Sequence, residues 1–172
     1  MMQGSIDSMN VIALGANLPG KLGSSVATLE SALERFGAEG LDIVKRSKWW
    51  RSAAWPDPSQ PDYINGVVLV ETSLSPGETL AALHRIETAL GRQRTTPNAS
   101  RTIDLDLIAC GRQQLDEPGL VLPHPRAGDR LFVMGPLAEI APDWMHPALG
   151  KSAWALAATA SIGLDSRPVI PV

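Results

Sequence analysis

Short apolar runs along the chain alternate with segments in which apolar residues recur every three to four positions. Four of the runs are rich in β-branched residues or alternate between apolar and polar positions, which predicts strands. The two segments with the longer spacing predict amphipathic helices. In chain order, we expect a strand at Asn10–Leu14, a helix at Val26–Phe36, strands at Leu41–Ser52 and Tyr63–Thr72, a helix from Ser75 to Leu90, and a strand at Thr102–Ala109.

The order of these elements indicates the fold class. Strand-helix-strand-strand-helix-strand is the βαββαβ arrangement of ferredoxin-like α+β sandwiches, in which an antiparallel sheet carries both helices on one face. The start of the second helix is well marked, because Ser75 can cap it, Pro76 suits its first turn and Glu78 can complete a capping box. The sequence therefore predicts a ferredoxin-like fold.

The two ends of the chain carry weaker patterns. After the last predicted strand we expect only C-terminal additions, with short apolar pieces at 120–122 and 132–140 and a helix from Ser152 to Ala160. Residues 1–9 show no periodic pattern, so we expect a flexible N-terminal extension. No linker or repeat divides the remainder, and we expect residues 10–172 to form a single domain.

Composition and charge narrow the classes of function. The 172 residues are 44% hydrophobic and 19% charged, which is ordinary for a globular protein. A net charge of −3 argues against a nucleic-acid binder, which usually carries a basic excess. Cys110 is the single cysteine, so no intrachain disulfide can form. Without a charged-then-apolar leader or an apolar run of about 18 residues, we expect a cytoplasmic protein with no membrane partner.

A pair of aspartates in the last predicted strand is the strongest sign of chemistry. Asp104 and Asp106 are two residues apart, so their side chains project from one face while Leu105, Leu107 and Ala109 point the other way. Two neighbouring anions repel each other unless a cation lies between them. Mg²⁺ commonly takes one or two carboxylates and fills its other positions with water and phosphate oxygens. The same spacing would also occur on an exposed sheet face that is merely acidic.

Arginines around this pair favour a phosphate site over a solvated surface. Seven of the fifteen Lys and Arg residues fall between Arg85 and Arg130, and all seven are Arg. The guanidinium group binds phosphate oxygens in a forked geometry. Five of these arginines flank the aspartates in sequence: Arg92, Arg94, Arg101, Arg126 and Arg130. Because the chain has neither a P-loop nor the protein-kinase signatures, phosphoryl transfer here would use another architecture.

An amide and three aromatic residues suggest a place for a flat heterocycle. Asn65 follows the proline-rich loop 53–62, and its amide suits the donor and acceptor edge of a heterocyclic ring. Trp55, Tyr63 and Phe132 could supply flat apolar walls, although each alone is better explained as an ordinary core residue. Trp55 stands apart because it lies in the proline-rich loop.

Together these segments resemble one family, the 6-hydroxymethyl-7,8-dihydropterin pyrophosphokinases of folate synthesis. The resemblance spans roughly Ile12 to Pro147. The segments that carry it are 13–18, 60–65, 85–87, 91–94, 101–107 and 122–126, with Arg130 and Phe132. Each segment alone is a weak signal, but their order and spacing together are highly specific.

The resemblance implies a diphosphotransferase that uses ATP as co-substrate and two Mg²⁺ ions. Asp104 and Asp106 would hold the ions and, with Arg92 and Arg101, form the catalytic set. The implied ATP-binding residues are His84, Glu87, Arg92, Arg94, Arg101, Leu107, His124 and Arg130. The implied pterin-binding residues are Ser52, Ala53, Trp55, Tyr63, Asn65 and Phe132, with the pterin stacked on Phe132.

Two loops depart from the family pattern. Ser52-Ala53 stands where the family usually has Thr-Pro, and the loop Thr95–Ser100 lacks the usual Trp and its adjacent Arg, for which Arg94 is the nearest replacement. The altered loop leaves open a degenerate paralogue that binds nucleotide or pterin with little turnover. An RNA-binding module is a further alternative, since ferredoxin-like sheets can present aromatic rings to bases. We expect a monomer with small-molecule partners and no nucleic acid.

Overall fold

The computed structural model describes residues 5–18, 22–54, 57–92 and 103–169. The strands are β1 (Asn10–Ala16), β2 (Asp42–Arg46), β3 (Trp50–Ser52), β4 (Tyr63–Glu71), β5 (Asp104–Cys110), β6 (Leu115–Glu117), β7 (Leu120–Leu122) and β8 (Arg167–Pro168). The α-helices are α1 (Ser25–Phe36), α2 (Pro76–Ala89), α3 (Leu131–Ile140) and α4 (Ala153–Thr159). Short 3₁₀ turns lie at Ile6–Ser8, Gly37–Glu39 and Ala127–Asp129.

The main sheet has six strands in the order β5-β1-β4-β3-β8, and β2 also pairs with β4. All of its strand pairs are antiparallel, while β6 and β7 form a separate hairpin. The strand β1 lies between β4 and β5, so the first and last predicted strands are neighbours. This arrangement confirms the predicted ferredoxin-like fold.

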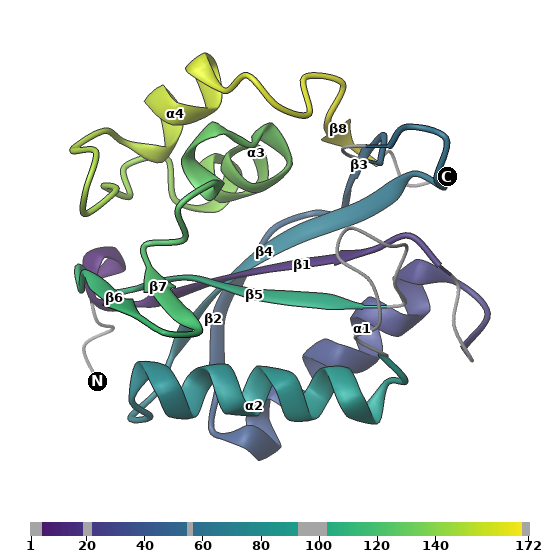
Figure 1. Cartoon of the computed structure of the whole chain (residues 1–172), viewed down its shortest axis with the longest axis horizontal. Helices are drawn as coiled ribbons and strands as arrows, with labels where there is room; N and C mark the ends of the chain where they lie inside the picture. Colours follow the sequence, from purple (N-terminus) through teal and green to yellow (C-terminus); the bar gives the residue numbers. More distant parts are fainter. Residues whose placement is uncertain (1–4, 19–21, 55–56, 93–102, 170–172) are drawn as a thin grey trace.

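Helices cover both faces of the sheet (Figure 1). The helices α1 and α2 pack on one face, as predicted, where Phe36 and Ile86 are buried against residues such as Ile12. The C-terminal additions α3 and α4 form a third layer on the other face, around the fully buried Trp144. The predicted helix at Ser152–Ala160 is confirmed as α4, which Ser152 caps. These helices cover part of the sheet surface on which an RNA-binding module would stack bases.

The single strand predicted from Leu41 to Ser52 is wrong, because this segment forms two shorter strands. Both β2 and β3 pair with β4, but Ser47 interrupts the ladder between them. The Val67 N–H donates to Ser47 Oγ at 3.0 Å, and the Ser47 N–H donates to Val67 O at 2.9 Å. A side-chain oxygen thus replaces a main-chain carbonyl, and the regular ladder resumes only at Trp50.

The apolar piece at 132–140, for which the sequence predicted no particular element, lies in helix α3. It is apolar on nearly every side, so it lacks the three-to-four spacing that marks a half-exposed helix, and Met134 is fully buried. Gly135 allows a close approach to β3, because a Cβ at this position would lie 2.7 Å from Cζ3 of Trp50. The Trp50 indole N–H donates to Glu139 Oε1 at 3.0 Å, which fixes α3 over the sheet.

A bulge in β5 breaks the predicted alternation of side chains near the end of this strand. Val11 pairs with Ala109 and Ile12 with Leu107, so Ile108 is an extra residue in β5. Ala109 therefore packs on the α3 side, and the prediction that it shares a face with Leu107 is wrong. The predicted alternation of buried and cavity-facing residues holds before the bulge, where the aspartates lie.

Residues 5–9 of the expected N-terminal extension form a short turn that packs on the domain. Ser5 caps the 3₁₀ turn at Ile6–Ser8, and Met9 is only 4% exposed. The Gly111 N–H donates to Met9 O at 3.1 Å, which ties this segment to the end of β5. Met9 packs with the core of the α3 and α4 face.

Two further expectations concern the single cysteine and membrane-spanning segments. Cys110 is buried, and burial raises the pKa of its thiol to about 12, so it behaves as a small apolar core residue. Among the residues that the structure describes, no helix combines the length and the apolar character needed to cross a bilayer.

Candidate active site

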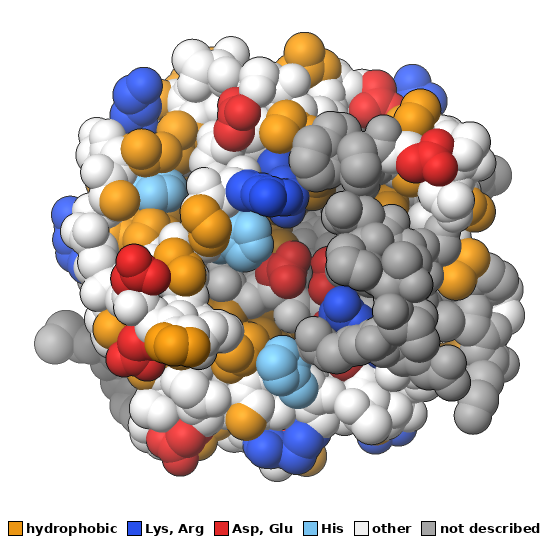
Figure 2. All heavy atoms as spheres, viewed as in Figure 1, with side chains coloured by type: hydrophobic (Ala, Val, Ile, Leu, Met, Phe, Trp, Pro, Cys, Tyr) orange, Lys and Arg blue, Asp and Glu red, His pale blue; other side chains and the backbone are white. Residues whose placement is uncertain are grey.

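A cavity of about 230 Å³ lies between the sheet and the start of α3. Strands β1, β4 and β5 form its floor, and the end of β3 and the chain around the start of α3 form its walls. Figure 2 shows a hollow near the centre of the view, with acidic side chains inside it and basic and histidine side chains beside them. Nine of the residues predicted from the sequence line the cavity: Ser52, Ala53, Tyr63, Asn65, Asp104, Asp106, His124, Arg130 and Phe132.

Asp104 and Asp106 form the acidic part of the floor. In the ladder between β1 and β5, Asp104 lies opposite Gly15 and Asp106 opposite Ala13. Both aspartates line the cavity, whereas Leu105 belongs to the core under α1 and α2. The alternation along the strand thus places the two acids together, as predicted, and the side chain of Asp104 is 22% exposed.

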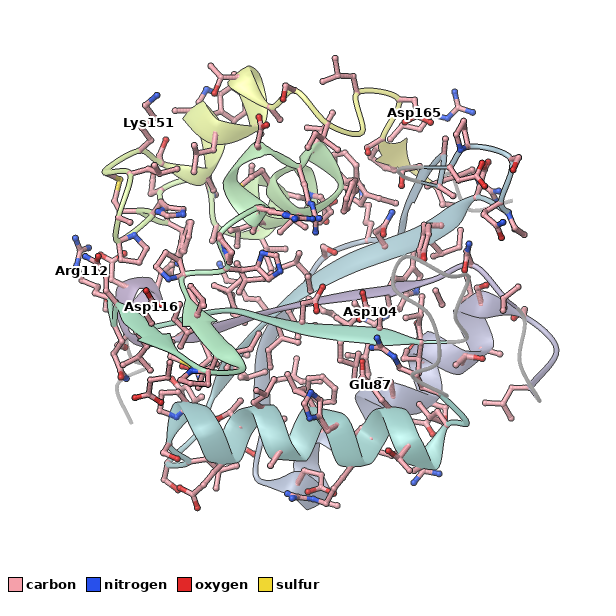
Figure 3. All side chains as sticks on the ribbon, viewed as in Figure 1. Glu87, Asp104, Arg112, Asp116, Lys151 and Asp165 are labelled. Carbon is pink, nitrogen blue, oxygen red and sulfur yellow. The ribbon has the colours of Figure 1, made fainter. Side chains whose placement is uncertain are left out.

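A network of ion pairs holds Asp104 to helix α2. Arg92 Nη1 donates to Asp104 Oδ1 at 2.8 Å and also to Glu87 Oε2. Glu87 is 1% exposed, and its Oε2 also accepts the Leu105 N–H at 2.8 Å. Burial would lower the pKa of Arg92, but the carboxylates of Asp104 and Glu87 outweigh it and raise this pKa, so the guanidinium stays charged. Figure 3 shows Glu87 below β5 and Asp104 on it, close to each other.

His124 reaches the cavity from the connection between β7 and α3. The main-chain N–H of His124 donates to Ile108 O at 2.8 Å, which anchors this residue to β5. Its Nδ1 accepts the main-chain N–H of Arg126 at 3.2 Å, so the neutral ring carries its proton on Nε2. Burial lowers the pKa of His124, and the nearby charge of Arg130 lowers it further. At neutral pH the imidazole is therefore an uncharged hydrogen-bond donor at Nε2.

The other half of the cavity presents an amide and two aromatic rings. Asn65 is 5% exposed, and its Nδ2 donates to Ser52 Oγ at 2.9 Å. The amide oxygen then lies on the side of Gly15, where a Cβ would approach Asn65 Oδ1 to 3.2 Å and Tyr63 Cδ1 to 3.6 Å. Phe132 also lines the cavity. An oriented amide beside two rings suits a flat heterocycle with polar edges.

Several predicted residues lie elsewhere. Glu87 and Leu107 are buried on the α1 and α2 side, so their side chains do not line the cavity. His84 lies partly exposed on α2, outside the cavity lining. The predicted site residues Trp55, Arg94 and Arg101 lie outside the described residues, as does the altered loop 95–100.

The sequence-based prediction assigned no role to two small residues of the floor. Ala13 and Gly15 lie opposite the two aspartates on β5, and both line the cavity. The sequence did contain a signal for these two residues, because both belong to the segment 13–18 that carries the family resemblance. Their importance comes from size, which becomes apparent only when the neighbouring strands are placed beside β1.

The donor set fits a hard divalent cation. In the described parts of the chain, no group of three or more His, Cys, Asp and Glu side chains could enclose a metal ion. Mg²⁺ needs no such group, since two carboxylates with water and phosphate oxygens complete its coordination. Asp104 already pairs with the positive charge of Arg92, so its carboxylate lies where a cation is favoured.

The fold and cavity together define a class of protein. Paired acids with Arg92, Arg130 and His124 suit the charge of transferred phosphoryl groups, and the amide with its rings suits a heterocyclic acceptor. A ferredoxin-like protein with this cavity belongs to the class of phosphotransferases that act on small molecules.

Comparison with known proteins identifies the family. The sequence model described as 7,8-dihydro-6-hydroxymethylpterin-pyrophosphokinase (HPPK) matches residues 11–142. A 2-amino-4-hydroxy-6-hydroxymethyldihydropteridine pyrophosphokinase of Synechocystis sp. is 44% identical over 143 residues, covering 83% of this chain and 71% of that protein. The protein of the same name from Pseudomonas aeruginosa is 37% identical over 157 residues, covering 91% of this chain and 95% of its own length. The chain therefore belongs to the HPPK family.

Longer proteins also contain the same unit. The folic acid synthesis protein fol1 of Pneumocystis carinii is 35% identical over 170 residues, which are 98% of this chain and 22% of that protein. The crystal structure of Plasmodium falciparum HPPK-DHPS superposes with a TM-score of 0.66 at 14% identity, covering 87% of this chain and 44% of that one. At this identity the structural match supports the fold alone.

Proposed function

We propose that this protein transfers a diphosphate group from ATP to the hydroxymethyl group of 6-hydroxymethyl-7,8-dihydropterin and releases AMP, as a step of folate biosynthesis. Family membership makes the protein a pterin pyrophosphokinase. The assignment of its site rests on one observation. Asp104 and Asp106 share the floor of one cavity with Asn65.

In this reaction the hydroxymethyl oxygen attacks the β-phosphorus of ATP. A bond forms between that oxygen and the β-phosphorus, and the bond from the β-phosphorus to the oxygen that stays on AMP breaks. We assign Asp104 and Asp106 to two Mg²⁺ ions, which would neutralise the phosphates and make the substrate hydroxyl more acidic. The geometry supports this assignment because both acids face the cavity and the side chain of Asp104 is partly exposed.

For the nucleotide half of the site we propose Arg92, Arg130 and His124 as phosphate contacts. A guanidinium offsets the charge that spreads over the transferred group and the leaving AMP. Neutral His124 would donate from Nε2 to a phosphate oxygen, a role that its lowered pKa supports. Arg101, Arg94 and His84 remain proposed members of this half, and Leu107 could contribute only through its main chain. Glu87 would act on the nucleotide only indirectly, because its carboxylate binds Arg92 and the main chain of β5 and so holds them together.

For the pterin half we propose that Asn65 pairs with the polar edge of the ring while Tyr63 and Phe132 enclose its faces. Ser52 orients the amide, since the Asn65 NH₂ group donates to its hydroxyl and leaves the carbonyl oxygen toward the cavity. Trp55 remains a proposed member of this half. The guanidinium carbon of Arg130 lies 5.6 Å from the centre of the Phe132 ring, so the nucleotide and pterin halves adjoin there.

We further propose that residues 10–172 act as one catalytic domain, as a cytoplasmic monomer that has neither nucleic-acid nor membrane partners. The net charge of −3 supports small-molecule partners over nucleic acid. The two helical layers on the sheet support the same view, since they cover part of the surface that RNA-binding sheets use.

The decisive experiment measures AMP. The purified protein is incubated with Mg²⁺ and ATP, with and without 6-hydroxymethyl-7,8-dihydropterin, and the nucleotides are separated by chromatography. We expect AMP and the pterin diphosphate to form in equal amounts, and only when both substrates are present. Formation of ADP, or pterin binding without AMP, would contradict the proposal, and the second result would identify a binding-only paralogue.

A further inference from the structure

The C-terminal segment 161–169 contacts both walls of the pterin half of the cavity. On one side, Ile162 O accepts the N–H of Leu131 at 2.9 Å, one residue before Phe132. Gly163 then lies against the Phe132 ring, where a Cβ would come within 2.6 Å of Cδ1. Its φ of +73° is also a conformation that favours glycine. The segment therefore supports the wall that Phe132 forms.

On the other side, the same segment pairs with β3. Figure 1 shows β8 beside β3, and Arg51 pairs with Arg167. Two residues further along this ladder, Ala53 comes opposite Asp165. The chain turns at 163–166, where the Ser166 N–H donates to Gly163 O at 2.9 Å. At this turn the side chain of Asp165, and not its main chain, supplies the next hydrogen bond to β3. Asp165 Oδ2 accepts the Ala53 N–H at 2.8 Å.

We propose that Asp165 is a positioning residue for the pterin substrate, which sets the separation of the Ala53 wall from the Phe132 wall; this inference rests on the proposed function. Ser52, Ala53 and Phe132 line the cavity, whereas Asp165 does not. Figure 3 shows Asp165 near β8, away from Asp104. Only three residues, 163–165, link the contact with Phe132 to the contact with Ala53, so the span between the walls cannot vary freely. A carboxylate acceptor also makes the bond to the N–H stronger than a neutral oxygen would.

Ala53 stands where the family usually has Pro, a residue with no N–H to offer a ligand. The N–H of Ala53 already binds Asp165, so Ala53 forms a wall of the cavity and does not serve as a hydrogen-bond donor to the pterin edge. The acid thus affects the pterin half of the site without touching substrate, and the nucleotide half should not respond to its loss.

The test compares three variants in the full chain. Asp165→Ala removes the acceptor, Asp165→Asn keeps a side-chain oxygen for the Ala53 N–H, and Leu164→Ala changes a neighbour that is 67% exposed. We measure KM for each substrate and the midpoint of thermal unfolding. Binding of 6-hydroxymethyl-7,8-dihydropterin is measured by calorimetry with Mg²⁺ and α,β-methylene-ATP. In this analogue a CH₂ group replaces the oxygen that bridges the α- and β-phosphorus, so the reaction cannot cleave the link.

For Asp165→Ala we expect the Kd and KM of the pterin to rise about five- to tenfold, with the KM of ATP unchanged, as the loss of one hydrogen bond predicts. Asp165→Asn should retain most of the affinity, and Leu164→Ala should match the wild type. An unchanged pterin Kd in Asp165→Ala, or an equal loss for ATP and pterin, would overturn the inference. So would an Asp165→Asn variant as weak as Asp165→Ala. If the wild type binds pterin but forms no AMP, only the proposed function fails, because the Kd comparison still tests Asp165.

Discussion

Arg92 Nη1 lies 2.8 Å from Asp104 Oδ1 and is hydrogen-bonded through the same nitrogen to Glu87, so one guanidinium bridges an acid of the cavity and an acid of the core. The two acids differ in surroundings, since Glu87 is 1% exposed and the side chain of Asp104 is 22% exposed. The network therefore separates two roles. Glu87 mainly holds α2, Arg92 and β5 together, whereas Asp104, a proposed metal ligand, faces the cavity.

The first prediction concerns stability. Glu87→Ala removes the buried partner of Arg92 and the acceptor of the Leu105 N–H, so the free energy of unfolding should fall by about 3–5 kcal/mol. Asp104→Ala should cost about 1 kcal/mol or less, because its carboxylate is partly solvated and Arg92 keeps Glu87. Urea unfolding of both variants tests this, with exposed Glu117→Ala as the control. Equal losses for Glu87 and Asp104 would contradict the division of roles.

The second prediction concerns the paired acids. Asp104→Asn and Asp106→Asn keep side-chain size but lose the charge proposed to hold Mg²⁺, so AMP formation should fall at least about a hundredfold at saturating ATP. The fold should persist, because both side chains line a cavity instead of filling the core. Circular dichroism checks the fold, and Asp116→Asn on the exposed hairpin serves as the matched control. Near-normal turnover in either variant would refute the metal assignment.

The third prediction concerns the cavity floor. Gly15→Ala places a Cβ 3.2 Å from Asn65 Oδ1 and 3.6 Å from Tyr63 Cδ1, so the amide that Ser52 orients must move slightly out of its present position. We expect the KM of the pterin to rise about tenfold or more, since a misplaced polar group no longer matches the ring edge. Gly77→Ala on α2 meets nothing within 4 Å and is the matched control. A variant of Gly15 with an unchanged pterin KM would show that Asn65 does not define the pterin position.

The fourth prediction concerns the dependence of stability on pH. His146 is 5% exposed, and its Nδ1 accepts the N–H groups of Ala148 at 3.1 Å and Leu149 at 3.0 Å. Burial lowers its pKa from the ordinary 6.5. The unfolded chain therefore binds a proton at a higher pH than the folded protein does. Stability should be constant above about pH 6.5 and fall as the pH drops from there toward the folded pKa.

His146→Asn provides the test, because its side-chain oxygen can replace the Nδ1 acceptor without titrating. Urea unfolding between pH 5 and 8 should give this variant a flatter profile than the wild type. Some slope should remain, since burial also lowers the pKa of His124. An unchanged slope would mean that His146 does not govern the acid response.

Local sequence patterns predicted a large part of the fold. The capping box at the start of α2 is present with both of its hydrogen bonds, from Glu78 N–H to Ser75 Oγ at 3.1 Å and from Ser75 N–H to Glu78 Oε1 at 3.0 Å. Such signals succeed because the groups involved are three residues apart. The alternation that placed Asp104 beside Asp106 succeeds for the same reason, since strand geometry alone aligns them.

The features that were predicted wrongly or not predicted at all depended on distant contacts. The Ser47 hydroxyl interrupts a strand only because Val67 lies opposite it, and Ala109 changes face only because Ile108 bulges against β1. Helix α3 has no amphipathic pattern because it is buried on nearly all sides. In each case a neighbouring element overrode the local preference.

The sequence by itself determined the element order, the ferredoxin-like class and the family, because these follow from short-range periodicity and from motifs with a definite spacing. It also determined that two carboxylates project together from one strand. Only the tertiary structure decided that Glu87 lies beneath the cavity and that Gly15 leaves room for the Asn65 amide. It alone joined Asp165 to Ala53, because hydrogen bonds and close packing between residues far apart in the chain exist only once the sheet and its helices are assembled.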